Sequence, residues 1–516
     1  MPHLLGIDIG TSGTKSLVMD EAGRVLATHT VEHSLQMPRP GWTQQDPEEW
    51  WEAAQKSVKG ALRKAKVRGG EIGAVGLSGQ MHGSVFLDRK GSVLRPALLW
   101  NDQRTAKQSA EIVERAGGER RMLELVGNLP LTGYTVPKIL WFREHEPKKW
   151  ARCASILLPK DYVRYRMCGD LATDVGDASG MCLVDVKRRT WSDELLRIMD
   201  IDKGLLPRLY ESPEVTGVMS AQGSKSLGLK EGTPVVAGGG DVMTGAVGNG
   251  IVEEGLINAN LGTGGVMCAH SDEPALDDAG ATVGRIATMC HAVPGAYVLF
   301  GCMLSAAGSL QWYADRFCDV EQARAKREKR SVFEVVLELA ERAPAGCEGL
   351  FFLPYLTGER CPHPDPDARA GWIGATRRTD RPMIVRSIVE GVTFNMSAML
   401  RIMREQMGVP VKQVRATGGG AKSALWRRIQ ADTYGAPVAI TNAQEGAAFG
   451  AALLAGVGAG VYRSVPDACR RLIKPTEVTK PDRKGTALYA RHQAVYDKLY
   501  GDLKDRFADM ARLVEA

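Results

Sequence analysis

The feature that most constrains the fold is a short apolar strand that runs directly into a turn rich in glycine and threonine. Residues 4–8 read as such a strand, and the Gly10-Thr11-Ser12-Gly13 turn follows at once. Backbone N–H groups in turns of this kind form concave anion sites, to which hydroxyl groups add donors. The segments that share this pattern are 6–15, 236–241, 261–265 and 416–420. Four of them in one chain predict phosphate binding at strand ends.

Glycine is frequent enough to support this interpretation. It makes up 58 of the 516 residues, roughly 11%, against a usual level of about 7%. The sequence contains no Gly-Lys dipeptide and no Gly-x-Gly-x-x-Gly motif. This excludes a Walker A loop, a Rossmann fingerprint and a protein-kinase loop. Any phosphate would therefore be held by the split turns of a two-lobed fold.

The order of predicted elements indicates an α/β chain built from two copies of one unit. In the first half we expect strands at 4–8, 14–19 and 24–31, a helix from Asp46-Pro47 to about residue 66, and a buried strand at 72–77. This is the opening of a ribonuclease-H-like unit. The second half repeats the theme, with strands at 256–260 and 411–416 and helices at 303–317, 382–407 and 424–434.

Two related lobes explain the length better than three unrelated domains do. We place the boundary near residue 250, with an N-terminal lobe at 1–248 and a C-terminal lobe at 249–516. The last segment carries aromatic and apolar residues at helical spacing and predicts a packing helix without chemistry: Tyr489, Tyr496, Leu499, Tyr500, Leu503, Phe507 and Met510.

Composition excludes several classes of protein. The chain has 66 Lys and Arg against 60 Asp and Glu, a net charge of +6 that gives no reason to expect a nucleic-acid partner or a membrane surface. The ten cysteines are scattered without a Cys-x-x-Cys pair, which disfavours zinc and fits reduced thiols in the cytoplasm. The N-terminus carries no signal segment, and the uncharged run 446–462 is too short and glycine-broken to span a membrane. We expect that run to be a helix buried against another backbone or a ligand.

Two carboxylates stand where chemistry is expected. Asp8 ends the first strand beside the first turn, where a carboxylate near phosphate is tolerable only if Mg²⁺ shares the site. Asp241 follows three glycines, so that no side chain blocks the approach of a hydroxyl to a general base. The structural alternatives are that Asp8 accepts N–H bonds of its turn and that Asp241 caps a helix beginning near Met243.

Two polar clusters suit a sugar. The Gln80-Met81-His82-Gly83 turn follows an apolar strand, and His82 could bond a hydroxyl, although a structural loop histidine is the simpler alternative. The second cluster places an aromatic side chain beside four polar ones, a combination typical of sugar sites: Trp100-Asn101-Asp102-Gln103-Arg104.

Taken together, these residues resemble the FGGY carbohydrate kinases, whose two lobes share the actin, hexokinase and chaperone-ATPase core with a cleft between them. The likeness runs from about residue 4 to about residue 475. The stretches that carry it are GIDIGTSGTKS, the Gln80–Gly83 turn, LWNDQR at 99–104, GYTVPK at 133–138, LPKDY at 158–162, GGGD at 238–241, LGTG at 261–264, FLPYLTGER at 352–360 and GAA at 446–448.

The resemblance implies a role for each matched position. Asp241 would be the base that takes the proton of the sugar hydroxyl, and Asp8 would help to hold Mg²⁺ through water. Met81 and His82 would contact the sugar, with Trp100 and Asn101 near it. The positions expected to face ATP are Thr11, Ser12, Lys15 and Thr263 at the phosphates and Gln311, Gly419 and Gly420 around the nucleotide.

The implied activity is phosphorylation of a sugar hydroxyl by MgATP. The Gln80–Gly83 turn favours D-xylulose as the acceptor, but relatives that act on xylulose usually carry Asn after the catalytic Asp, and this chain has Val242. Another ketose or a polyol, such as ribulose, a deoxy-pentulose or glycerol, is therefore the alternative within the family. A non-catalytic actin-like protein is the alternative outside it. The resemblance also implies a homodimer, which is frequent in the family.

Overall fold

The chain divides by packing into two compact units. The computed structural model describes residues 3–278, 282–443 and 445–515. Unit 1 comprises Met1–Glu253, His270–Val298 and Ala443–Lys474, and unit 2 comprises Glu254–Ala269, Leu299–Asn442 and Pro475–Ala516. The boundary at residue 248 is a division along the sequence and stays a prediction. Packing adds the late segment Ala443–Lys474 to the first unit.

Unit 1 is built on a sheet in the order β13-β14-β5-β1-β2-β3, with β15 beside β5. Its strands are β1 (His3–Ile9), β2 (Gly13–Met19), β3 (Val25–Glu32), β5 (Ile72–Gly79), β13 (Val215–Val218), β14 (Pro234–Val236) and β15 (Gly239–Gly240). The first three strands pair antiparallel, and β5 runs parallel to β1. The strands predicted in the first half of the chain are confirmed.

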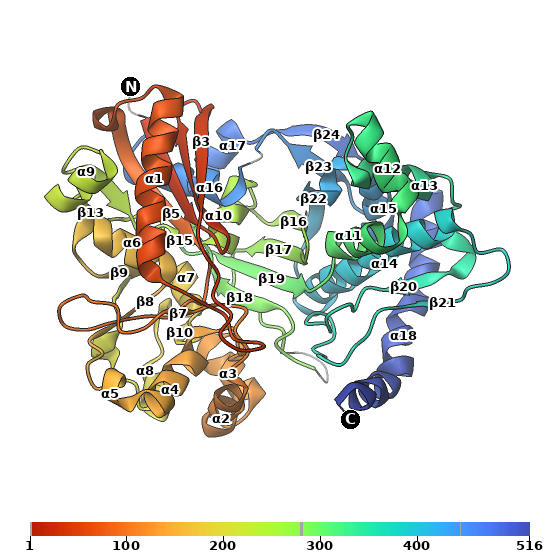
Figure 1. Ribbon diagram of the computed structural model, residues 1–516, viewed down its shortest axis with the longest axis horizontal. Helices are drawn as coiled ribbons and strands as arrows, with labels where there is room; N and C mark the ends of the chain where they lie inside the picture. The colour runs from red at the N-terminus through yellow and green to blue at the C-terminus, as the bar shows by residue number, and fades with distance from the viewer. Residues whose placement is uncertain (1–2, 279–281, 444, 516) are drawn as a thin grey trace. The chain divides into compact units, whose positions relative to one another are not determined.

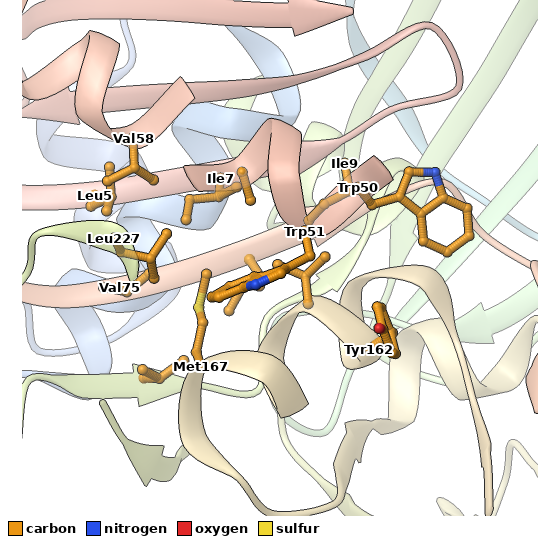
Figure 2. Packing of buried hydrophobic residues seen from close by; sticks show 14 of the residues in the cluster. Leu5, Ile7, Ile9, Trp50, Trp51, Val58, Val75, Tyr162, Met167 and Leu227 are labelled. Atoms are coloured by element: carbon orange, nitrogen blue, oxygen red, sulfur yellow. The ribbon is translucent and has the colours of Figure 1, made fainter. Parts of the chain in front are cut away.

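One face of this sheet is covered by α1 (Pro47–Ala65), the predicted helix. The Asp46 carboxylate caps it by accepting the Glu48 N–H at 3.0 Å. Trp50, Trp51 and Val58 of α1 pack with Leu5, Ile7 and Ile9 of β1 in one buried cluster (Figure 2). These strand residues alternate with Gly6 and Asp8, which therefore face the other side of the sheet.

The other side is covered by α16 (Gly446–Gly458), the helix predicted to be buried against backbone. In Figure 1 this blue helix lies among the red strands of unit 1, and it packs on β1 and β5. A Cβ on Gly6 would lie 2.0 Å from the Ala448 carbonyl oxygen, and one on Gly76 would lie 2.0 Å from that of Ala451. Backbone packs directly on backbone here, and the prediction is confirmed.

The same helix crosses α10 (Asp241–Gly248) just as closely. A Cβ on Gly248 would lie 1.9 Å from the Gly446 oxygen, and one on Gly450 would lie 1.9 Å from the Thr244 oxygen. Glycines therefore determine how closely α16 packs against all three of its neighbours, β1, β5 and α10. No described helix is long and apolar enough to cross a membrane.

Unit 2 repeats the strand order of unit 1, as the sequence predicts. Its sheet runs β18-β19-β17-β16-β22-β23-β24, with β18 (Ala287–Cys290) at the edge, and the order from β19 to β24 matches β3-β2-β1-β5-β14-β13 position by position. The strands are β16 (Gly255–Leu261), β17 (Gly265–Ser271), β19 (Tyr297–Met303), β22 (Val411–Thr417), β23 (Val438–Thr441) and β24 (Pro475–Thr479). As in unit 1, the central pair is parallel, here β16 with β22, and β16 pairs antiparallel with the strand that follows it.

The helices of unit 2 differ from the predicted ones mainly at their ends. α11 (Ala307–Phe317) begins four residues late because Met303 still belongs to β19, and α14 (Arg381–Arg401) gives way to a π-turn at Ile402–Gln406. α15 (Ala424–Tyr434) has the predicted bounds. The predicted packing helix is α18 (Arg483–Glu515), which buries Tyr489, Tyr496 and Phe507 but leaves Met510 half exposed.

The remaining elements surround these two sheets. In unit 1 they are α2 (Ala106–Ala116), α3 (Glu119–Val126), α4 (Thr135–His145), α5 (Pro147–Trp150), α6 (Pro159–Cys168), α7 (Val175–Ser179), α8 (Asp193–Met199), α9 (Ala221–Leu227), α17 (Val465–Leu472), β4 (Gln44–Gln45), β6 (Val85–Leu87), β7 (Ala97–Leu98), β8 (Ser155–Leu157), β9 (Ala172–Asp174), β10 (Val184–Asp185), β11 (Thr190–Trp191) and β12 (Arg208–Tyr210). In unit 2 they are α12 (Asp319–Glu328), α13 (Val332–Glu341), β20 (Phe351–Leu353) and β21 (Gly371–Ile373). Single 3-10 turns lie at Gly69–Glu71, Lys203–Leu205, Cys347–Gly349 and Gly420–Lys422.

The close approach of α16 predicts a large effect from one added methyl group. We expect Gly76→Ala to lower the free energy of unfolding by about 1–3 kcal/mol or more, because β5 and α16 must separate to admit it. Urea denaturation followed by circular dichroism measures the change. Gly70→Ala is the matched control, since a Cβ there meets no atom within 4 Å and should change stability by less than about 0.5 kcal/mol. Equal stability of the two variants would contradict the backbone-on-backbone contact.

Candidate active site

Three parallel strands of unit 1 end at one edge of the sheet and bring the two predicted carboxylates to it. Asp8 on β1 lies opposite Ser78 on β5, and Gly239 on β15 lies opposite the same Ser78 from the other side. Asp241 follows β15 directly as the first residue of α10. The carboxyl ends of parallel strands are where open α/β sheets bind ligands. Asp8 and Asp241 therefore share the edge at which a ligand is expected.

Two of the three glycines before Asp241, Gly238 and Gly240, are required by neighbouring atoms. Gly238 has a φ of +78°, and a Cβ there would lie 2.2 Å from the Leu77 carbonyl oxygen. A Cβ on Gly240 would lie 2.6 Å from Met81 Cγ and 3.1 Å from Asp177 Oδ1. The helix-cap alternative for Asp241 is wrong, because α10 begins at Asp241 itself and Gly240 is the capping residue, with no side-chain cap.

The charge of Asp8 affects the ionisation of Asp241. Burial, and after it the negative charge of Asp8, raise the pKa of Asp241 to about 7. Burial also raises the pKa of Asp8, against the opposing effects of a Ser78 hydrogen bond and the Lys15 charge. Asp8 Oδ1 is buried and has no hydrogen-bond partner. A carboxylate with a pKa near neutrality is suited to take a proton from a hydroxyl.

The predicted sugar residues Met81 and His82 reach this edge from the turn after β5. Both side chains are largely buried. His82 adopts a φ of +68°, its ring stacks on Tyr134 with centroids 4.3 Å apart, and its Nδ1 lies 2.7 Å from the Gly180 carbonyl oxygen. Since a carbonyl only accepts, Nδ1 carries the proton, and in the neutral form of the ring Nε2 is then an acceptor. This orientation suits a hydroxyl donor.

A buried charge cluster holds the segment that orients His82. Lys160 Nζ lies 2.5 Å from Asp161 Oδ1 and 2.8 Å from Asp174 Oδ1, and all three side chains are buried. Burial alone would lower the pKa of Lys160, but the carboxylates around it raise that pKa overall. Asp174 also caps α7 by accepting the Gly176 N–H at 2.8 Å, and Gly180 follows that helix. Sequence reasoning quoted Lys160 only as part of a likeness and missed this role.

Trp100 and Asn101 lie on the loop after β7, but only part of the predicted polar cluster faces outward. Trp100 is 44% exposed, and Asn101 accepts a hydrogen bond from the Thr43 hydroxyl at 2.6 Å. Asp102 and Arg104 instead form a buried ion pair at 2.8 Å, with the guanidinium stacked over Trp42. That pair shapes the loop and is not open to a ligand.

The first glycine turn and the strand β2 that follows it carry three predicted phosphate residues with different surroundings. The Thr11 hydroxyl accepts the Trp100 Nε1–H at 2.9 Å and donates to Gln80 Oε1 at 3.1 Å. Ser12 is exposed. Lys15 Nζ lies 3.1 Å from Glu445 Oε2, and both side chains are partly exposed. Of the three, Ser12 presents its side chain to solvent, while Thr11 and Lys15 already have protein partners.

The other nucleotide residues lie together in unit 2. The Thr263 carbonyl oxygen accepts the N–H groups of Ala306 and Gly308, which fixes its turn to the start of α11, the helix that carries Gln311. Since Asn260 pairs in parallel with Thr417, the turn at Gly419 and Gly420 lies at the same edge of the sheet. A Cβ on Gly419 would meet no atom within 4 Å. This edge of unit 2 therefore carries two glycine-rich turns, whose backbone N–H groups could meet an anion.

Comparisons with known proteins cover both units. The chain matches the N-terminal domain of the FGGY family of carbohydrate kinases over residues 3–248 and its C-terminal domain over residues 257–459. The xylulose kinase of Escherichia coli K12 is 36% identical, over 97% of this chain and 99% of the relative, and that of Bacillus subtilis 168 is 34% identical over 98% of each. The crystal structure of xylulose kinase from Rhodospirillum rubrum is similar with a TM-score of 0.88 at 26% identity, over 98% of this chain and 100% of that one. The predicted α/β fold with two related lobes is confirmed.

The pair of carboxylates predicts a measurable titration. Asp8→Asn should lower the pKa of Asp241, because the repulsion that favours its protonated form disappears. The value should stay above the ordinary aspartate range, since burial, the larger cause, remains. Carbon-13 NMR of the labelled carboxyl group, without nucleotide or metal, measures it. An unchanged or raised pKa would show that Asp8 and Asp241 do not interact.

Proposed function

The chain belongs to the FGGY family of carbohydrate kinases, and from that premise we propose that it transfers the γ-phosphoryl group of ATP to O5 of D-xylulose. The observation that carries the proposal is Asp241, a partly buried carboxylate with a pKa of about 7 at the strand edge where Met81 and His82 also lie. Relatives called xylulose kinases are similar over almost the whole chain, which supports this acceptor.

In the proposed step, Asp241 takes the proton of the O5 hydroxyl as O5 attacks the γ-phosphorus. The bond between the γ-phosphorus and the β,γ-bridging oxygen breaks, and ADP leaves with the electron pair. Burial and the Asp8 charge make Asp241 a stronger base than an exposed aspartate, yet it is still half ionised near pH 7. The loose transition state of phosphoryl transfer needs positioning and charge neutralisation more than covalent help.

The residues around Asp8 fit Mg²⁺. Its buried Oδ1 has no hydrogen-bond partner, and a carboxylate oxygen is the ligand type that this cation prefers. Asp8 would hold the ion through water, and the ion would neutralise charge on the phosphates. The repulsion between Asp8 and Asp241 would also fall in its presence.

Two glycine-rich turns would bind the nucleotide. Ser12 and the N–H groups of its turn would meet the terminal phosphates, and Lys15 would join them by exchanging Glu445 for a phosphate oxygen. Thr11 belongs to the same turn. In unit 2, the residues assigned to the nucleotide are Thr263, Gln311, Gly419 and Gly420.

The sugar would lie against His82 and Trp100. The His82 Nε2 acceptor would bind a hydroxyl proton, the exposed indole of Trp100 would cover an apolar face, and Met81 and Asn101 would complete the contact. Val242 removes an amide that xylulose-specific relatives usually have, so ribulose or another ketose or polyol is the second candidate acceptor.

We also propose a cytoplasmic location, where ATP is supplied, and a homodimer, which light scattering would detect.

Replacing the proposed base should separate binding from chemistry. We expect Asp241→Asn to bind the sugar nearly as well as the unchanged protein while kcat falls about 10²–10⁴-fold, the usual contribution of a general base. Calorimetry of sugar binding and a coupled assay of ADP release measure the two effects. The variant should fold at least as well at pH 8, because the cost of a buried carboxylate that ionises with rising pH is gone. Turnover close to that of the unchanged protein would remove Asp241 from this role.

Comparing kcat/KM across a panel of sugars and a polyol identifies the acceptor. D-xylulose should give the highest kcat/KM among xylulose, ribulose, deoxy-pentuloses and glycerol, measured by ADP release. Val242→Asn should lower the KM for xylulose several-fold if the amide meets a sugar hydroxyl, with KM for ATP as the internal control. A higher kcat/KM for another member of the panel would transfer the proposal to that acceptor.

A further inference from the structure

One network of hydrogen bonds in unit 1 connects the first phosphate turn with both sugar-side segments, and the roles proposed above do not use it. It consists of Thr11, Gln45, Gln80 and Trp100, called here the Thr11 network. The Thr11 hydroxyl accepts from Trp100 Nε1 at 2.9 Å and donates to Gln80 Oε1 at 3.1 Å. Its one proton is committed to Gln80, so Thr11 would meet a phosphate through its backbone N–H.

Gln45 is the centre of this network. Its side chain is buried, and both ends of its amide are used. Nε2 donates to the Thr11 carbonyl oxygen at 2.7 Å, and Oε1 accepts from Gln80 Nε2 at 2.9 Å. Oε1 also accepts from the buried Trp50 Nε1 at 3.0 Å, which ties the amide to α1. One amide therefore holds the phosphate turn by its donor end and the sugar turn by its acceptor end.

The network joins parts of the chain that belong to different proposed substrates. Thr11 lies just after β1, and Gln80 lies just after β5, where its N–H donates to the Ile9 carbonyl oxygen at 2.8 Å. Met81 and His82 follow Gln80 directly. Trp100 enters from a third segment, and 44% of its surface is exposed, so a ligand can cover it.

We propose that Gln45 and Gln80 are positioning residues that make the phosphate turn depend on the presence of the sugar. This inference rests on the proposed function. A sugar against Trp100 restricts the indole, the indole fixes the Thr11 hydroxyl, and the two glutamines hold Thr11 and the turn before Met81 in one arrangement. The phosphate turn is then ordered when the acceptor is bound, which limits the transfer of phosphate to water.

Gln45→Met and Gln44→Met form a matched pair for the test. Gln44 is the neighbour in β4, and its amide bonds instead with Gln36 and, at 3.4–3.5 Å, with Arg95 and Arg104. We expect Gln45→Met to lower kcat about 10- to 100-fold, because small displacements of reacting groups have effects of that size. The ratio of sugar-dependent turnover to ATP hydrolysis without sugar should fall with it. Gln44→Met should keep both quantities within about threefold.

Circular dichroism and the melting temperature establish that both variants are folded. A folded Gln45→Met with unchanged kcat and an unchanged ratio would overturn the inference, and so would an equal loss in Gln44→Met. If the unchanged protein phosphorylates no sugar of the panel, the proposed function fails instead. The two failures are therefore distinguishable.

A double-mutant cycle tests the link between Trp100 and Thr11 without relying on turnover. Trp100→Phe keeps an aromatic ring but removes the N–H, and Thr11→Val keeps the shape but removes the hydroxyl. The quantity measured is the factor by which saturating sugar tightens binding of a non-hydrolysable ATP analogue, determined by calorimetry. Each variant should lower this factor, and the double variant should lower it no further than either single variant. Additive losses, or an unchanged factor in Trp100→Phe, would overturn the link.

Discussion

The contact of α16 with β1, β5 and α10 is the constraint on which unit 1 depends. Gly6, Gly76, Gly248 and Gly450 each lie where an added Cβ would be 2.0 Å or less from a backbone oxygen of the facing element. Because no side chain fits at these four positions, the backbones of the facing elements touch directly, and this fixes the spacing between the elements. Asp8 ends β1 and Asp241 begins α10, so this packing also decides how far apart the two carboxylates are held.

The strand-end edges of the two sheets have the same backbone arrangement, because the strand order is duplicated, but they carry different side chains. Both units place a glycine-rich turn after the corresponding central strand, β1 in one and β16 in the other. In unit 1 the edge also carries Asp8 and Asp241, whose mutual repulsion raises the pKa of the latter. In unit 2 the corresponding turns offer Thr263, Gly419 and backbone N–H groups without a carboxylate. The first edge is suited to acid–base chemistry and the second to holding an anion.

Most of the fold could be predicted because its signals are local. The N-cap of α1 at Asp46, the alternation of β1 and the glycine turns all lie within a few residues of the elements they define. Predictions were less accurate where tertiary contacts decide the boundary. Met303 could begin a helix by its own pattern but extends β19, and the π-turn at Ile402–Gln406 interrupts a pattern that reads as one helix. By its sequence Asp241 could be the residue that caps a helix, yet α10 begins at Asp241 itself and its capping residue is Gly240.

The sequence by itself determined which residues stand at strand ends and which chemistry they can perform, because strand, turn and residue type are short-range properties. Only the tertiary structure decided what those residues contact. The Thr11 hydroxyl is directed to Gln80 and Trp100, Lys15 is paired with Glu445, and Asp102 and Arg104 neutralise each other. Partners such as Glu445 lie hundreds of residues away, and no local pattern marks Gln45 as the amide that joins two turns. The direction in which a side chain points and the pKa of its group depend on such partners. Hydrogen bonds and charges act over a few ångströms in space, whatever the separation of the two residues along the chain.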